Sequence, residues 1–152
     1  MMQLTDHFSL EELIASETAA RKHIDNMPPV ELMPNLRVLA QGLEQVRAAL
    51  GGRPIHINSG YRSLALNKEI GGAEKSKHMF GLAADILCPQ FGTPLDVCRA
   101  IVVAKIPVDQ VIHEFGKWCH VSFAAPGEEA RGELLTIASA AKGYETGLNP
   151  VV

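Results

Sequence analysis

SKHMFGLAAD, residues 76–85, is the stretch from which the rest of this sequence is best interpreted. It places His78 and Asp85 seven positions apart, and divalent metals accept both side chains as ligands. A hydrolytic zinc site takes three protein ligands and keeps a fourth coordination position open. The best candidate for the third ligand is His120, in the segment WCHVSF at residues 118–123. The sequence therefore predicts a metal triad that the fold has to bring together.

The second half of this stretch opens a predicted strand over residues 82–88. Alternation places Asp85 on one face with Ala83 and Leu87, while the other face is more apolar. A buried carboxylate without a partner costs free energy, so Asp85 needs one. A metal ion is one such partner, and a backbone donor or a salt bridge is the alternative.

The flanking segments predict further helices and strands. Residues 30–50 carry one apolar stripe at intervals of three and four, which is typical of a core helix. Other helices are expected at residues 8–13 and 64–70 and from Thr93 onward. Strands are expected at residues 54–59 and 82–88 and in a hairpin over residues 108–123. Residues 18–29 are predicted to form a polar connection.

The signals become weaker beyond Pro126. Residues 133–138 fit either a helix or an added strand, and residues 143–152 have the composition of an exposed tail. We therefore predict a C-terminal extension over residues 126–152, packed or partly exposed.

The composition limits the functions open to this chain. Its 152 residues suit one domain, and its formal net charge of -3 gives no general attraction to nucleic acid or anionic membranes. No apolar run approaches the roughly 20 residues that span a bilayer, and the N-terminus lacks a signal-peptide pattern. Three widely spaced cysteines indicate buried thiols in a reducing compartment, not a disulfide framework.

A hydrolytic site also needs a proton acceptor, and the predicted hairpin offers His113 and Glu114. A two-residue loop would pair Phe115 with Trp118 and turn His113 toward the face of His120. A three-residue loop with a glycine bulge would instead place Glu114 opposite His120. The sequence leaves both registers open, and the suitability of a carboxylate for proton transfer beside zinc favours Glu114.

Arg62, in SGYRS at residues 59–63, follows a predicted strand just before the metal stretch. It is either a surface arginine paired with Glu69 or Glu74, or a fixed cation that faces the site.

Taken together, SGYRS at 59–63, S-x-H-x-x-G-x-A-x-D at 76–85 and W-x-H at 118–120 resemble the M15 family of zinc peptidases. This family includes zinc D-alanyl-D-alanine carboxypeptidases, D-Ala-D-Ala dipeptidases and phage endolysin peptidases, and the chain looks most like its short M15A-type domains. The resemblance spans residues 8–123. It implies an α+β fold, a small mainly antiparallel sheet with helices packed on one side (Hedgehog/DD-peptidase-like), with the zinc peptidase domain over residues 1–125.

The resemblance also implies roles for individual residues. His78, Asp85 and His120 would bind Zn²⁺, and Arg62 would bind the substrate carbonyl and stabilise the developing oxyanion. Ser76 would support the ligands from the surrounding shell.

One position departs from the family pattern. Many members carry the catalytic carboxylate three positions before the last histidine, where this chain has Lys117. The nearest acid is Glu114, six positions before His120, with His113 as the alternative base.

The leading hypothesis is a zinc metallopeptidase that hydrolyses peptide bonds in the peptidoglycan stem peptide or cross-link, as a phage endolysin does in cell-wall lysis. The alternative, favoured by Lys117, is a non-catalytic cell-wall-binding or phage structural module that retains the zinc fold. We expect a monomer that acts on peptidoglycan, without nucleic acid or a stable membrane anchor. It would stay in the cytoplasm until release through a separate pore, or travel in the virion.

Overall fold

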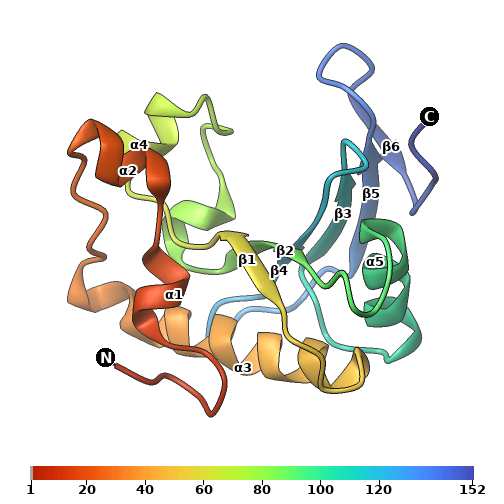
Figure 1. Cartoon of the computed structure of the whole chain (residues 1–152), viewed down its shortest axis with the longest axis horizontal. Coiled ribbons are helices and arrows are strands. Elements are labelled where there is room, and N and C mark those ends of the chain that lie inside the picture. Colours follow the sequence, from red (N-terminus) through yellow and green to blue (C-terminus); the bar gives the residue numbers. More distant parts are fainter. Residues whose placement is uncertain (1) are drawn as a thin grey trace.

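One sheet contains the strands that carry Asp85 and His120 (Figure 1). The computed structural model describes residues 2–152, and the strand order in its sheet is β1-β2-β4-β3-β5-β6. The strands are β1 (His56–Ser59), β2 (Ala83–Leu87), β3 (Gln110–Glu114), β4 (Trp118–Ser122), β5 (Glu133–Ile137) and β6 (Tyr144–Thr146). All neighbours are antiparallel except β3 and β5, which are parallel. The predicted α+β class with a mainly antiparallel sheet is confirmed.

The longest helix is α3 (Met33–Ala49), preceded by the short 3-10 helix η1 (Val30–Leu32). Its apolar stripe is completely buried at Leu36, Leu39, Leu43 and Val46. Together with α5 (Pro94–Val103), α3 packs against the face of the sheet that carries Ala84 and Val121. The opposite face of β2 and β4 is left for polar side chains, because residues alternate between faces along a strand.

Short helices, each begun by a serine cap, fill the connections. They are α1 (Leu10–Ile14), α2 (Glu17–Lys22), α4 (Leu64–Glu69) and the 3-10 helix η2 (Lys77–Phe80). The prediction of a polar connection over residues 18–29 was wrong for its first part. There Ser16 accepts the backbone N–H of Ala19, and this cap begins α2 without a long apolar pattern.

The C-terminal residues extend the sheet. Of the two alternatives for residues 133–138, the strand is correct, since β5 pairs with β3. The predicted exposed tail over residues 143–152 is exposed at β6, but this segment also forms a strand that pairs with β5. Both strands supply partners for backbone groups that β3 and β5 would otherwise present at an open edge. The division of the chain at residue 125 stays a prediction.

Cys88, Cys98 and Cys119 are buried free thiols, as predicted. Across residues 2–152, no helix combines the length and the apolar character needed to cross a membrane.

Candidate metal centre

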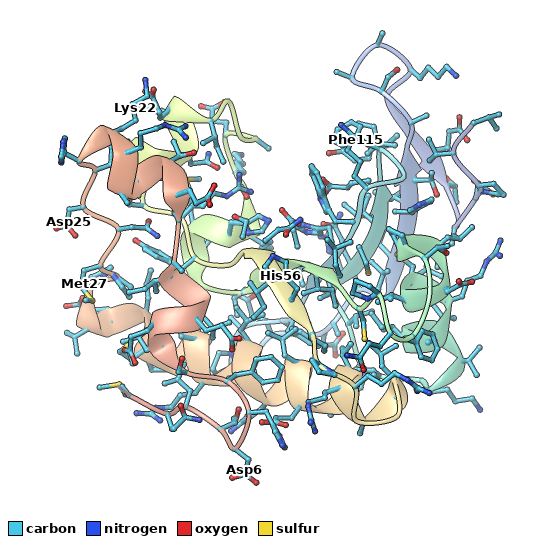
Figure 2. All side chains as sticks on the ribbon, viewed as in Figure 1. Asp6, Lys22, Asp25, Met27, His56 and Phe115 are labelled. Atoms are coloured by element: carbon cyan, nitrogen blue, oxygen red, sulfur yellow. The ribbon has the colours of Figure 1, made fainter. Side chains whose placement is uncertain are left out.

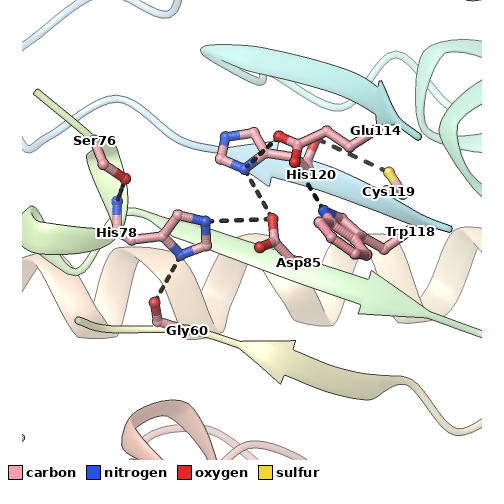
Figure 3. Close-up of polar contacts among 8 residues, drawn as sticks. All are labelled: Gly60, Ser76, His78, Asp85, Glu114, Trp118, Cys119 and His120. Carbon is pink, nitrogen blue, oxygen red and sulfur yellow. Dashed lines mark hydrogen bonds and ion pairs between the residues drawn. The ribbon is translucent and has the colours of Figure 1, made fainter. Parts of the chain in front are cut away.

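The strands β2 and β4, together with η2, bring His78, Asp85 and His120 into one cluster (Figure 3). Asp85 and His120 are direct partners in the β2–β4 ladder and therefore share a face of the sheet. Asp85 Oδ1 lies 2.9 Å from His120 Nδ1 and 3.3 Å from His78 Nε2. All three residues are buried, so the cluster lies below the molecular surface.

The geometry of this cluster fits a divalent ion. One potential ligand atom from each residue lies within 4.8 Å of the other two. Ligands of a tetrahedral zinc ion, each at about 2.0–2.1 Å, are separated by about 3.3 Å. The observed separations from Asp85 Oδ1 are close to this value, and the two-nitrogen, one-oxygen donor set suits zinc.

His78 is oriented by backbone and side-chain contacts. Its Nδ1 lies 2.7 Å from the carbonyl oxygen of Gly60, which assigns the ring proton to Nδ1 and leaves Nε2 free as an acceptor. The Oγ of Ser76 accepts the backbone N–H of His78 at 3.2 Å and caps η2. Sequence reasoning missed Gly60, although a glycine directly after a strand often marks a close backbone approach. Here a Cβ would collide with the backbone carbonyl of Leu13.

The charges in the cluster favour a cation. Burial alone would raise the pKa of Asp85, but the neighbouring imidazoles of His78 and His120 hold it far below its usual range. Burial lowers the pKa of His78, which favours its neutral form. Burial acts in the same direction on His120, but the hydrogen bond and charge of Asp85 raise its pKa overall. The ionised Asp85 therefore attracts positive charge to this position.

Glu114 reaches the same face of the sheet. The β3–β4 hairpin pairs Glu114 with Trp118 and leaves three residues, 115–117, in the loop. This is the loop length for which Glu114 was expected on the face of His120, and its side chain is there, with Oε1 3.6 Å from His120 Nδ1. The expected partner was wrong, since Ile112 lies opposite His120.

The loop explains this register. Phe115 and Gly116 both adopt positive φ values, 58° and 68°, and Lys117 adds an extra residue before β4. Lys117 is exposed, and its backbone N–H donates to the Glu114 carbonyl at 2.9 Å. An odd number of loop residues therefore places Glu114 and Trp118 on one face.

The carboxylate of Glu114 is held and partly buried. Trp118 donates its indole N–H to Oε2 of Glu114 at 2.9 Å. Burial raises the pKa of Glu114, opposed first by the charge of His120. A carboxylate whose proton affinity is raised in this way is suited to accept a proton at neutral pH.

The structure does not bring His113 to the cluster. His113 pairs with Cys119 on the opposite face of the hairpin. It is buried there, and its Nδ1 lies 2.8 Å from the carbonyl oxygen of Asn149 in the C-terminal segment. The two-residue loop that would have turned it toward His120 does not form.

The segment that carries Arg62 is fixed from two sides. The Arg62 backbone N–H donates to the carbonyl of His78 at 3.1 Å. The buried amide of Asn26 accepts the N–H of Ser63 at 2.8 Å and donates to the carbonyl of Tyr61 at 3.1 Å. Asn26 gave no recognisable signal in the sequence, because its hydrogen-bond partners lie 12 to 37 positions away.

Arg62 lines the cleft and, within residues 2–152, forms no ion pair. Of its two expected surface partners, Glu69 pairs with Lys22 instead, at 3.3 Å. The Arg62 Nε is buried without a hydrogen-bond partner. Burial lowers its pKa while Asp85 and Glu114 oppose the shift, and a guanidinium in this setting remains charged.

The cluster, Arg62 and Glu114 line one cleft of about 740 Å³. Its walls also include Lys77 from η2, and Arg131 and Tyr144 from the C-terminal extension. The arrangement combines a cation-binding cluster, a proton acceptor and a fixed positive charge around one space. These are the components needed to polarise a carbonyl, activate water and stabilise an oxyanion.

Comparisons with known proteins agree with this chemistry. A family model described as Peptidase M15 matches residues 6–122. Among curated proteins, the chain is similar to the zinc D-Ala-D-Ala carboxypeptidase of Streptomyces albus G, with 44% identity over 52 residues. That stretch is 34% of this chain and only 20% of the relative's length. The similarity therefore concerns one part of a longer protein.

Proposed function

This chain belongs to the peptidase M15 family, and we propose that it is a zinc-dependent peptidase that hydrolyses peptide bonds in the peptidoglycan stem peptide or cross-link. The observation that carries the proposal is the position of Glu114, whose Oε1 lies 3.6 Å from His120 Nδ1. His120 belongs to a cluster whose ligand atoms suit a tetrahedral ion. The similarity to a zinc D-Ala-D-Ala carboxypeptidase supports the choice of metal and substrate.

In this proposal His78 Nε2, His120 Nδ1 and one carboxylate oxygen of Asp85 hold the zinc ion. When bound, zinc supplies a Lewis acid that polarises the scissile carbonyl and lowers the pKa of water. Asp85 neutralises part of the metal charge, and the Gly60 carbonyl keeps the His78 ring in the tautomer that coordinates through Nε2.

The remaining steps fall to Glu114 and Arg62. The Glu114 carboxylate accepts a proton from the attacking water and returns it to the leaving amine. Trp118 keeps that carboxylate aimed at the cluster through its indole hydrogen bond. Arg62 lines the cleft and binds the substrate carbonyl as negative charge develops on its oxygen.

A second candidate is a non-catalytic module that binds the cell wall and retains the metal site. Its support is Lys117, which occupies the position of the acid in many relatives and is exposed on the hairpin loop. Glu114 weakens this alternative, because it supplies a carboxylate beside the cluster from the other strand of the hairpin.

Turnover separates the two candidates. Zinc-loaded wild type, Glu114→Gln and the control Glu129→Gln are incubated with purified sacculi, and newly freed amines are counted. We expect release by wild type and by Glu129→Gln, an exposed residue away from the cleft. Glu114→Gln should lose at least about 100-fold in rate, because general-base catalysis contributes 10²–10⁴-fold. No amine release by the zinc-loaded wild type would support the binding module.

Mass spectrometry of the fragments identifies the bond. A product shortened by one D-alanine indicates a carboxypeptidase, whereas cleavage within the stem or the cross-link indicates an endopeptidase. We further propose a role in cell-wall lysis, after release through a separate pore or from a virion. Loss of turbidity when zinc-loaded protein is added to cells with exposed peptidoglycan tests that role, and D-alanine release without lysis would contradict it.

A further inference from the structure

Tyr144, in the C-terminal strand β6, lies in line with Glu114 across the sheet. In the ladder, Glu114 pairs with Ile137 of β5, and Ile137 pairs with Tyr144 of β6. Side chains at paired positions share one face of a sheet, so all three point to the cleft side. Two strand spacings place the Glu114 and Tyr144 backbones about 10 Å apart.

Tyr144 is one of three aromatic side chains that form a wall of the cleft, together with Phe115 and Trp118. The chain has five Phe, one Trp and two Tyr, yet Phe115, Trp118 and Tyr144 all line this one cleft. Phe115, at the tip of the β3–β4 hairpin (Figure 2), packs edge-on against Trp118 with ring centroids 5.7 Å apart. Such a concentration in an aromatic-poor chain points to ligand contact, because aromatic side chains dominate the lining of binding pockets.

Tyr144 is the member of this wall with a free polar group. Its side chain is 59% exposed, and within residues 2–152 its hydroxyl has no hydrogen-bond partner. The partial burial of Tyr144 and the nearby Glu114 charge both raise its pKa, so the hydroxyl stays protonated and able to donate. An exposed ring with an unused donor at the edge of a cleft is poorly explained by core packing.

We propose that the C-terminal extension completes the substrate cleft, with Tyr144 donating a hydrogen bond to the backbone of a peptide that lies in the cleft between Tyr144 and Glu114. This inference rests on the proposed peptidase function. The family match ends at residue 122, so Tyr144 is a substrate-binding residue from outside the matched segment. It would act on substrate binding and not on the chemical step.

The test uses the full-length, zinc-loaded protein and three variants. Tyr144→Phe removes only the hydroxyl, and Tyr144→Ala removes the ring as well. Glu145→Gln is the matched control, because Glu145 is exposed on the opposite face of β6. Cleavage of a peptidoglycan stem peptide gives kcat and KM, and zinc content is measured for each protein.

A second readout does not depend on turnover. Trp118 is the only tryptophan and lines the cleft, so its fluorescence reports binding of a dipeptidyl hydroxamate. We expect Tyr144→Phe to raise KM and the hydroxamate Kd about five- to tenfold, the loss of one hydrogen bond. Tyr144→Ala should raise both further, while kcat and zinc content stay within about twofold.

The outcomes separate this inference from the proposed function. If wild type does not cleave the stem peptide but Tyr144→Phe still weakens hydroxamate binding, the peptidoglycan proposal fails and Tyr144 remains a peptide-binding residue. If Tyr144→Phe and Tyr144→Ala match wild type in both readouts, the inference is overturned. It is also overturned if the hydroxamate does not bind the wild type, or if Glu145→Gln weakens binding equally.

Discussion

Trp118 donates its indole N–H to Oε2 of Glu114 at 2.9 Å, between directly paired residues of the β3–β4 hairpin. The other carboxylate oxygen, Oε1, lies 3.6 Å from Nδ1 of His120. One oxygen is thus held by the strand neighbour while the other faces the metal cluster. Trp118, which orients the proposed base, and His120, a proposed metal ligand, are therefore two positions apart on the same face of β4.

Trp118→Phe should uncouple these two features. The ring volume is partly kept, but the hydrogen bond that aims Glu114 is lost, and we expect kcat to fall about tenfold or more. Zinc content should stay unchanged because no proposed ligand is altered. The same substitution in a Glu114→Gln background should have little further effect, since the two residues act as a unit. Additive losses in steady-state kinetics would contradict this coupling.

Gly60→Ala should weaken zinc binding although Gly60 is not one of the proposed ligands. An added Cβ meets the Leu13 backbone, which cannot move aside as a flexible side chain can. The Gly60 carbonyl would shift away from His78 Nδ1, and loss of such support costs about 10- to 100-fold in metal affinity. Competition with a chromophoric chelator measures the zinc Kd. Gly127→Ala is the control, because Gly127 has open space around it and should lose stability without changing that Kd.

Asp109 should make the free energy of unfolding depend on pH in the acidic range. The hydrogen bond from Arg131 holds the pKa of this carboxyl below its usual value, with contacts at 3.0 and 2.9 Å. Its contribution is therefore complete above the unfolded pKa of about 4 and is lost as the pH falls through the lower folded pKa. Since the Arg131 side chain is 55% exposed, we expect the pair to contribute only about 1 kcal/mol.

Urea unfolding across a pH series measures this contribution. Asp109→Asn should cost about 1 kcal/mol at pH 7, and its difference from wild type should shrink toward pH 3. The control is Glu129→Gln, which removes the same charge from an exposed residue that forms no side-chain hydrogen bond or ion pair among residues 2–152. A difference between Asp109→Asn and wild type that persists unchanged at pH 3 would contradict the argument.

Removal of zinc should lower both activity and thermal stability. Without the ion, the buried Asp85 carboxylate is contacted by two histidines instead of a metal, and a ligand that binds the folded state alone stabilises that state. At about 1,000 times its Kd this amounts to about 4 kcal/mol, or about 10 °C in Tm for a chain of this size. Chelation followed by calorimetry measures the shift, and added zinc should reverse it. Asp85→Asn should show little response to zinc, and a full response would remove Asp85 from the proposed ligand set.

Much of the fold could be predicted from local pattern. The stripe in α3, the serine and threonine caps and the alternation in β2 each depend on residues within a few positions of one another. The alternation also placed Asp85 on the face opposite the apolar core, where the structure has it. The structure of the C-terminal segment was harder to predict, because β5 and β6 are defined by pairing with other strands and not by their own periodicity.

The sequence by itself determined which residue types and motifs were available: His78, Asp85 and His120 in their segments, with Arg62 nearby. Only the tertiary structure decided that Glu114 and not His113 faces the cluster, because one added loop residue reverses the face of every side chain in a strand. It also decided that Gly60 orients His78 and that Tyr144 lines the cleft. Those contacts join positions far apart in the chain, where no local pattern records them.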